Sequence, residues 1–219
     1  MNLLPALIKI IVIDLVLSGD NAVVIGMAAH RLPPRQRKMA ILIGGGAAIV
    51  LRIGLTAIAT LLLQLSGLQL IGGALLLWIA FKLLKAEEES HEGVKEAASM
   101  KDAIITILIA DFVMSLDNVL GVAAAAEGHM GLLLFGLAFS MAILMFMGSL
   151  VAELVNKWWW LGYVGSAVIA WTGAHMMFKD AIVKSRLELS HTLEYVTFGA
   201  ITLLTLGFAH WFHRVREKS

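Results

Sequence analysis

Two copies of one acidic motif stand inside apolar stretches of the chain. The first reads Asp14-Leu-Val-Leu-Ser-Gly-Asp-Asn21, and the second, 97 residues later, reads Asp111-Phe-Val-Met-Ser-Leu-Asp-Asn118. Carboxylate, amide, hydroxyl and backbone carbonyl oxygens are hard ligands, which suit Mn²⁺, Mg²⁺ or Ca²⁺ better than Cu⁺ or a structural Zn²⁺. The motifs therefore predict an oxygen-ligand site for a divalent cation.

The composition indicates that these motifs lie in a membrane. Hydrophobic residues make up 59% of the 219 residues and charged residues 15%, and the mean hydropathy of +0.86 is far from that of a soluble domain. A helix needs about 20 apolar residues to cross a bilayer. We therefore predict an all-α membrane protein with seven transmembrane helices, near residues 3–29, 39–64, 68–84, 103–126, 131–152, 158–178 and 193–212. Because the first span lacks the features of a signal peptide, we expect it to stay in the mature protein.

Acidic side chains in such helices are costly. An ionised Asp at the centre of a membrane helix costs roughly 2.5 to 3.5 kcal/mol, so four cost about 10 kcal/mol before compensation. Interhelical hydrogen bonds are a structural alternative, but Ser, Thr or Asn would supply them at lower cost. We therefore expect a metal site with ligands from both motifs: Asp14, Asp20, Asn21, Asp111, Asp117 and Asn118. Ser18 and Ser115 are weaker candidates.

A straight helix cannot aim both carboxylates of the first motif at one point. At about 100° per residue, Asp14, Ser18 and Asn21 fall within about 60° of one another, whereas Asp20 points roughly 120° away. Either the two carboxylates serve different contacts, or the helix unwinds near Ser18-Gly19 and frees carbonyl groups for the site. The second motif has a leucine in place of this glycine, which makes a break there less expected.

A second pair of segments extends the duplication. Gly72-Gly-Ala-Leu-Leu-Leu-Trp78 resembles Gly165-Ser-Ala-Val-Ile-Ala-Trp171 at an offset of 93 residues, so each copy covers three spans. An odd number of spans inverts the second copy, which predicts two inverted three-helix repeats plus a seventh helix, the plan of many secondary transporters. The expected single transmembrane domain, residues 1–219, comprises repeat one (3–85), an acidic linker (86–102), repeat two (103–179) and the extra helix (193–212).

Lysine and arginine predict the orientation. Twelve of them lie at span ends on one side, against three on the other, which are Lys179, Lys184 and Arg186. The more basic side should be cytoplasmic, which places the N-terminus outside and the C-terminus inside. On the inner side, the linker from Glu87 to Asp102, with five glutamates, is expected to be a solvated and partly disordered connector. Metal sensing by His91 together with these glutamates is the alternative.

The two motifs also carry a family resemblance. Ser18-Gly-Asp-Asn-Ala-Val-Val-Ile25 and Ser115-Leu-Asp-Asn-Val-Leu-Gly-Val122 resemble the paired signatures of the TerC family of integral membrane proteins. The resemblance runs over essentially the whole chain and looks strongest for the small bacterial YjbE-type branch. It implies export of Mn²⁺ across the bacterial cytoplasmic membrane, with an ion site carried over by position to Asp14, Asp20, Asn21, Asp111, Asp117 and Asn118. It does not imply a tellurite substrate.

The leading hypothesis is therefore a secondary transporter that exports a divalent cation, with Mn²⁺ as first candidate and proton coupling as an option. Ca²⁺ and Mg²⁺ are alternatives, as is a membrane assembly or metallation partner of secreted proteins. The sequence has no ATP-binding loop and lacks the Tyr-Asp and Gly-x-Gly-Asp signatures of intramembrane aspartyl proteases, so we expect no enzyme, no catalytic residue and no cofactor. The expected partners are the metal ion and the bilayer, not nucleic acid, and a homodimer is left open.

Three further residues have open roles. Arg52 in the second span is expected either to pair with a motif Asp and hold the empty site together, or to be purely structural. Glu153 is expected to be a solvated helix end. The histidines near the spans are interpreted as non-ligands, with His175 the least certain.

Overall fold

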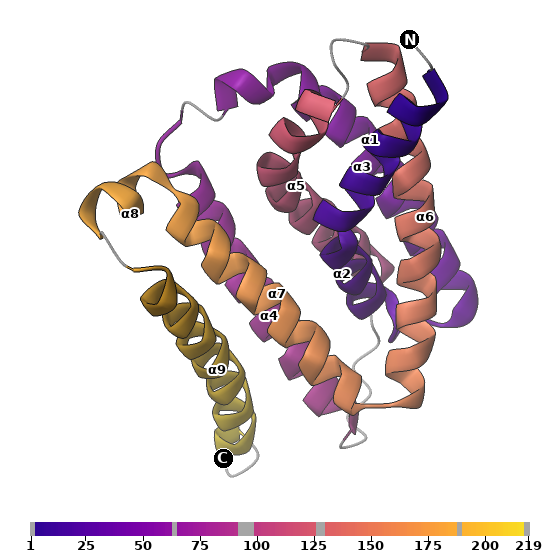
Figure 1. Ribbon diagram of the computed structural model, residues 1–219. Helices are drawn as coiled ribbons and strands as arrows, with labels where there is room; N and C mark the ends of the chain where they lie inside the picture. The colour runs from indigo at the N-terminus through magenta and orange to yellow at the C-terminus, as the bar shows by residue number, and fades with distance from the viewer. Residues whose placement is uncertain (1–2, 63–64, 92–98, 126–129, 188–189, 217–219) are drawn as a thin grey trace. The chain divides into compact units, whose positions relative to one another are not determined.

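The computed structural model describes residues 3–62, 65–91, 99–125, 130–187 and 190–216. Every regular element in these ranges is a helix, which confirms the predicted all-α class (Figure 1). In chain order the helices are α1 (Leu3–Leu17), α2 (Gly19–Ala29), α3 (Pro34–Leu62), α4 (Leu68–His91), α5 (Met100–Ala125), α6 (Met130–Lys157), α7 (Trp160–Lys179), α8 (Ala181–Arg186) and α9 (His191–Arg216).

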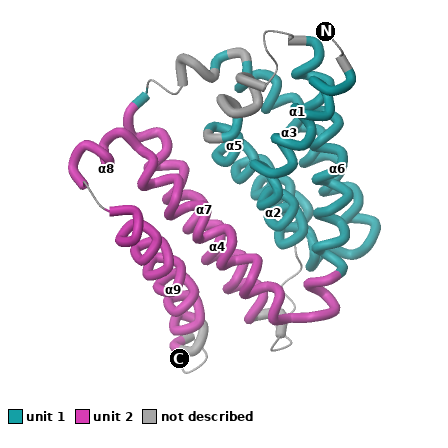
Figure 2. The backbone as a smooth tube through the Cα atoms, in the orientation of Figure 1, with its two compact units in different colours: residues 1–65, 99–153 teal, residues 66–98, 154–219 magenta. Residues whose placement is uncertain are grey.

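The chain divides into two compact units, which Figure 2 draws in different colours. Unit 1 comprises residues 1–65 and 99–153, with α1, α2, α3, α5 and most of α6. Unit 2 comprises residues 66–98 and 154–219, with α4, α7, α8 and α9. Each unit thus takes helices from both predicted repeats. The single transmembrane domain expected from the sequence stays a prediction.

Small residues allow close helix contacts in unit 1. α3, α1 and α2 all lie against α5. A β-carbon at Gly136 of α6 would lie 2.6 Å from Cγ2 of Ile10 in α1, and one at Gly148 would lie 2.5 Å from Cγ2 of Ile25 in α2. Glycine at these two positions therefore lets α6 pack closely along both halves of the first span.

In unit 2, α4 and α7 lie side by side with their backbones in contact. A β-carbon at Gly73 of α4 would lie 2.4 Å from the carbonyl oxygen of Gly173 in α7. Conversely, a β-carbon at Gly173 would lie 2.8 Å from the carbonyl oxygen of Gly73. The contact is therefore reciprocal, and neither helix has room for a side chain there.

One buried carboxylate joins the ends of the helices in unit 2. Asp180 is 2% exposed and accepts hydrogen bonds from the backbone N–H groups of Gly67 at 2.9 Å, Leu70 at 3.2 Å and Ile182 at 2.9 Å. Gly67 has a φ of 90°, a conformation that favours glycine. Asp180 thereby satisfies free N–H groups at the starts of α4 and α8.

α9, the helix outside the predicted repeats, contacts α4 and α7 through aromatic rings. The ring centroid of Phe198 lies 5.6 Å from that of Trp171 and 5.2 Å from that of Phe178, both in α7. Phe208 lies 5.5 Å from Phe81 of α4. Such aromatic pairs contribute about 0.5 to 1.5 kcal/mol each beyond their buried area.

Within the described residues, four helices have the length and composition to span a membrane: α3, α4, α6 and α9. The pair α1 and α2, bent by 54°, would make a fifth as one broken span. α7 interrupts its apolar residues with tryptophan, tyrosine and histidine. In α5, the side chains of Asp117 and of residues 119–125 lie outside the described residues. Neither helix is therefore among the four, and the total of seven spans stays a prediction.

The acidic stretch after the third expected span differs from its prediction. α4 continues to His91, so Glu87 and Glu88 are helical, and each is only 7% exposed. The close approach of α7 explains this burial, because a β-carbon at Gly162 would lie 2.8 Å from Cγ of Glu87. The expected solvated connector does not include these two residues, and residues 92–98 lie outside the described part of the chain.

Replacing Gly73 with alanine should separate α4 from α7, because the new β-carbon would collide with the backbone of Gly173. We expect a loss of about 1–3 kcal/mol, measured as a lower melting temperature in detergent. Gly207→Ala in α9 is the matched control, since a β-carbon there meets nothing within 4 Å. Equal melting temperatures for the two variants would contradict the proposed close contact.

Candidate cation site between the duplicated motifs

The first span is broken at Ser18, between α1 and α2. Ser18 has φ −113° and ψ 12°, and the two helices are bent by 54°. The helix is therefore interrupted near Ser18-Gly19, as one of the two alternatives from the sequence required. The break does not exclude the other alternative, different contacts for Asp14 and Asp20. Gly19 does not adopt a positive φ, which among the described glycines occurs at Gly67. α5 runs through the second motif without a break, as its leucine at the matching position suggested.

The asparagine of each motif reaches the other motif. Nδ2 of Asn118 donates to the carbonyl oxygen of Leu17 at 3.0 Å and to Oγ of Ser18 at 3.1 Å. A helix end leaves its last carbonyls without intrahelical partners, so Asn118 replaces a bond that the break removes. In the other direction, Nδ2 of Asn21 donates to Oδ1 of Asp111 at 3.1 Å.

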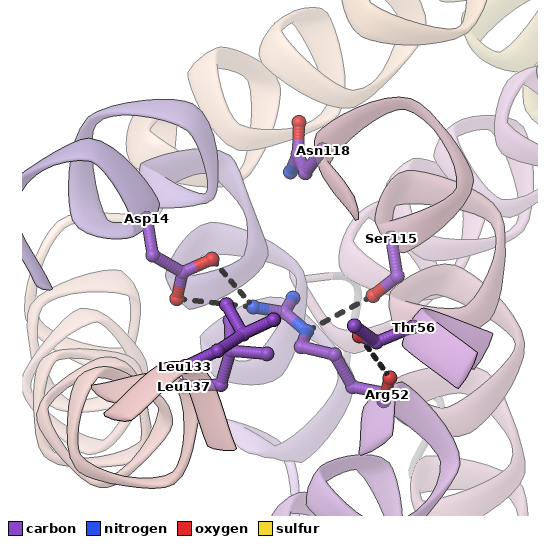
Figure 3. A pocket seen from close by; sticks show the side chains of 7 residues that line it. All are labelled: Asp14, Arg52, Thr56, Ser115, Asn118, Leu133 and Leu137. Atoms are coloured by element: carbon purple, nitrogen blue, oxygen red, sulfur yellow. Dashed lines mark hydrogen bonds and ion pairs between the residues drawn. The ribbon is translucent and has the colours of Figure 1, made fainter. Parts of the chain in front are cut away.

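Arg52 of α3 lies between the two motifs (Figure 3). Its Nη1 lies 3.1 and 3.2 Å from the two carboxylate oxygens of Asp14, and its Nη2 lies 2.8 Å from Oδ1 of Asp111. Its Nε donates to Oγ of Ser115 at 3.0 Å. The three charged side chains are at most 3% exposed. Two carboxylates and one guanidinium leave one net negative charge in this buried group.

Serine hydroxyls complete the hydrogen bonds of the two carboxylates. Ser18 donates to Asp14 and Ser115 to Asp111, each at 3.3 Å and each one helical turn apart. Ser140 of α6 also donates to Asp14 and is fully buried. The sequence interpretation missed Ser140, for which the only signal is one hydroxyl in an otherwise apolar run.

A small pocket lies beside Arg52. Its volume is about 10 Å³, enough for about one water molecule. Nearby, the amide oxygen of Asn21 is buried and accepts no hydrogen bond from the described residues. An unsatisfied buried oxygen costs about 1–3 kcal/mol, so this oxygen is available to accept a hydrogen bond or to coordinate a cation. The pocket is lined by Asp14, Arg52, Thr56, Ser115, Asn118, Leu133 and Leu137 (Figure 3).

Comparison with known proteins identifies the family. The model of the integral membrane protein TerC family matches residues 2–218. This chain belongs to the TerC family. It is 38% identical over 205 residues to YjbE of Bacillus subtilis strain 168, an uncharacterized membrane protein, and the match covers 94% of this chain and 92% of YjbE. The expected likeness to YjbE is thereby confirmed.

Two more distant relatives are inner membrane proteins of Escherichia coli K12. YoaE is 30% identical over 173 residues, which is 69% of this chain but only 33% of YoaE. YgdQ is 25% identical over 169 residues, which is 69% of this chain and 71% of YgdQ. No solved structure matches the chain. Family membership and the apolar helices make this TerC family member a multi-pass membrane protein.

Four of the six ligands predicted for this TerC family protein gather around Arg52: Asp14, Asn21, Asp111 and Asn118. Asp20 lies in the first turn of α2, where the positive end of the helix dipole stabilises its charge, and its Oδ1 is buried. Asp117 belongs to α5, but its side chain lies outside the described residues. As ligands, all six stay predictions.

The described part of the chain contains no cluster of three or more His, Cys, Asp or Glu side chains that could hold a metal. A cation between Asp14 and Asp111 would therefore depend on hydroxyl, amide and backbone oxygens for its other ligands. Hydroxyls and amide groups of this kind surround the two carboxylates, at Ser18, Ser115, Ser140, Asn21 and Asn118. Carboxylate, hydroxyl and amide oxygens of this kind are suitable ligands for a hard divalent cation.

The structure also describes three of the other candidate residues. Glu153 is exposed. The ring of His175 packs against that of Phe198 in unit 2, with centroids 5.6 Å apart. Nδ1 of His30 lies 2.7 Å from the carbonyl oxygen of Met27, and His129 lies outside the described residues.

Arg52→Gln should strongly destabilise the protein without metal, because it leaves two buried carboxylates without their cation. Breaking a buried ion pair costs about 3–5 kcal/mol, or a melting temperature lower by about 10 °C in detergent. Adding Asp111→Asn should recover part of the loss. Arg35→Gln, at an exposed position of the same helix, is the control. If Arg52→Gln melted like Arg35→Gln, the ion bridge would not stabilise the fold.

Proposed function

We propose that this TerC family protein is a secondary transporter that exports a divalent metal cation, with Mn²⁺ as first candidate, across the bacterial cytoplasmic membrane. The observation that carries the proposal is the buried bridge of Arg52 between Asp14 and Asp111. Charged side chains inside membrane helices are costly and mark ion pathways. Inverted-repeat transporters build their ion sites at broken helices, and the first motif lies at such a break.

The proposed architecture is seven spans, formed by two inverted three-helix repeats and α9. Within unit 1, the same serine-to-aspartate bond occurs in both motifs. Within unit 2, the glycine contact between α4 and α7 is reciprocal. Glu87 and Asp180 are separated by the repeat offset of 93 residues, and each lies near the start of the other helix. These paired contacts support a two-fold relation within each unit.

The proposed ligands are hard oxygens, which favour Mn²⁺ over softer ions and leave Ca²⁺ and Mg²⁺ as competitors. The metal is cargo, so the proposal needs no cofactor and no catalytic residue. The proposed topology has the N-terminus outside and the C-terminus inside, from the distribution of basic residues.

Arg52 has a defined part in this mechanism. The pocket beside it is too small for a hydrated ion, and a divalent cation next to a guanidinium would meet like charge. We therefore infer that Arg52 leaves Asp14 and Asp111 when the metal binds and returns when it is released. Arg52 then cancels one of the two negative charges of the empty site. Hydrogen bonds from Ser18, Ser115 and Asn21 stabilise the remaining negative charge, so the empty transporter needs no proton for this purpose.

Asp14→Asn and Asp111→Asn should each reduce Mn²⁺ flux into sealed proteoliposomes by about 100-fold or more, since each removes a counter-charge worth about 3–5 kcal/mol from a buried site. Asp102→Asn, an exposed position in the same helix as Asp111, should transport normally. Asp20→Ala and Asp117→Ala test the wider ligand set by isothermal titration, where loss of Mn²⁺ binding is expected. Unchanged flux in Asp14→Asn would refute the site, and no flux in the wild type would favour a metallation partner.

A pH gradient separates the two ways of balancing the charge. If Arg52 and the surrounding hydrogen bonds stabilise the empty site without a proton, Mn²⁺ flux in proteoliposomes should stay constant, within about a factor of two, when the trans side is made acidic. If acid on the trans side instead accelerated Mn²⁺ flux, and Asp14→Asn or Asp111→Asn weakened this effect, protons would compensate the charge of the empty site. The part proposed for Arg52 would then be wrong.

A further inference from the structure

A second buried polar cluster lies in unit 2, where α4, α7 and α9 meet. Oε1 of Glu88 accepts a hydrogen bond from the hydroxyl of Tyr163 at 2.6 Å and lies 3.0 Å from Nδ1 of His210. The Glu88 side chain is 7% exposed, whereas that of His210 is 47% exposed. The second oxygen, Oε2 of Glu88, is buried and has no hydrogen-bond partner in the described residues.

A positive charge on the imidazole next to Glu88 would offset the cost of burying its carboxylate. A buried carboxylate with an unbonded oxygen is costly, and the cost is larger for a charged group than for a neutral one. Histidine is the side chain that changes its charge between about pH 5 and pH 8. Because His210 is half-exposed, it can exchange protons with water, which the buried Glu88 cannot do directly.

The other ionisable groups near Glu88 come from α4, α7 and α9. On α4 they are Lys85, whose Nζ lies 5.3 Å from the ring centroid of Phe212, and the buried Glu87. On α7 the group is Tyr163, and on α9 it is His210. Among the described contacts of Glu88, the imidazole of His210 is thus the partner whose charge follows mild changes of pH.

α9 is the helix on which such a contact would have most effect. Only 17% of its membrane-spanning window is buried, against 39% for the windows in α3, α4 and α6. Aromatic contacts of Phe198 and Phe208 attach it to α7 and α4. The contact between Glu88 and His210 adds a polar interaction to this largely apolar attachment.

We propose that Glu88 and His210 form a proton-binding site that fastens α9 to α4 and α7. When His210 is protonated, its hydrogen bond to Glu88 is charge-assisted. When His210 is neutral, Nδ1 donates an uncharged and weaker hydrogen bond or donates none. The difference corresponds to about a tenfold change in the equilibrium between attached and loosened α9. The stabilisation is present at mildly acidic pH and is lost as rising pH removes the proton from histidine. This inference is independent of the proposed transport function.

A double-mutant cycle measured at two pH values tests the pair. Wild type, Glu88→Gln, His210→Gln and the double variant are unfolded in detergent at about pH 6 and about pH 8.5. The coupling between the two positions, expressed in the unfolding equilibrium, should be about tenfold larger at the lower pH than at the higher one. The control cycle uses His191 and Glu194 on the same helix, a pair 3.7 Å apart with a 98% exposed histidine.

Distances between spin labels test the effect on α9. The chain has no cysteine, so cysteines at Ile71 of α4 and Leu204 of α9, which are 64% and 71% exposed, can be labelled specifically. In liposomes the distribution of distances between the two labels should broaden as pH rises. The control variant His191→Gln should show the same broadening. His210→Gln and Glu88→Gln should not respond to pH. Each of three results would overturn the proposal. The coupling between Glu88 and His210 could be absent at acid pH, it could be equal at both pH values, or the label distances could be independent of pH.

Discussion

Two carboxylates in an apolar interior require a compensating charge, and the arrangement of unit 1 follows from this requirement. Asp14 and Asp111 come from different helices and are both shielded from water, so their repulsion would separate α1 from α5. The guanidinium of Arg52 binds both at once. A planar group with several fixed donors can do this, whereas a lysine ammonium would act as a single point charge.

The break in the first span serves the same site. Ending α1 at Leu17 frees a carbonyl that Asn118 then binds, and it starts α2 in a new direction with Asp20 in its first turn. One sequence motif thereby yields two carboxylates in different surroundings. Asp14 belongs to the ion bridge, and Asp20 faces the positive end of a helix dipole. A continuous helix, such as α5, keeps the buried aspartate and serine but makes no such turn.

Residue type and spacing were enough to predict the helical class, the motif residues that meet around Arg52 and the possible break at Ser18. They could not decide whether Arg52 pairs with a motif aspartate, because this depends on how α3 packs against α5. Residue type and spacing also gave no sign that Ser140 donates to Asp14. They assigned Glu88 to a solvated linker. Burial of a polar residue near a helix end is set by neighbours distant in sequence, here Tyr163 and His210, and no local pattern contains that information.

We propose above that a divalent cation and Arg52 compete for the carboxylates of Asp14 and Asp111. Crystals of the protein grown with Mn²⁺ would test it directly, by anomalous diffraction at the manganese edge. The account predicts an anomalous peak within coordination distance of Asp14 and Asp111, about 2.0–2.6 Å as for other hard divalent ions, with the guanidinium of Arg52 moved away. A peak at another place, or a peak at this site with Arg52 still bound to both carboxylates, would contradict it.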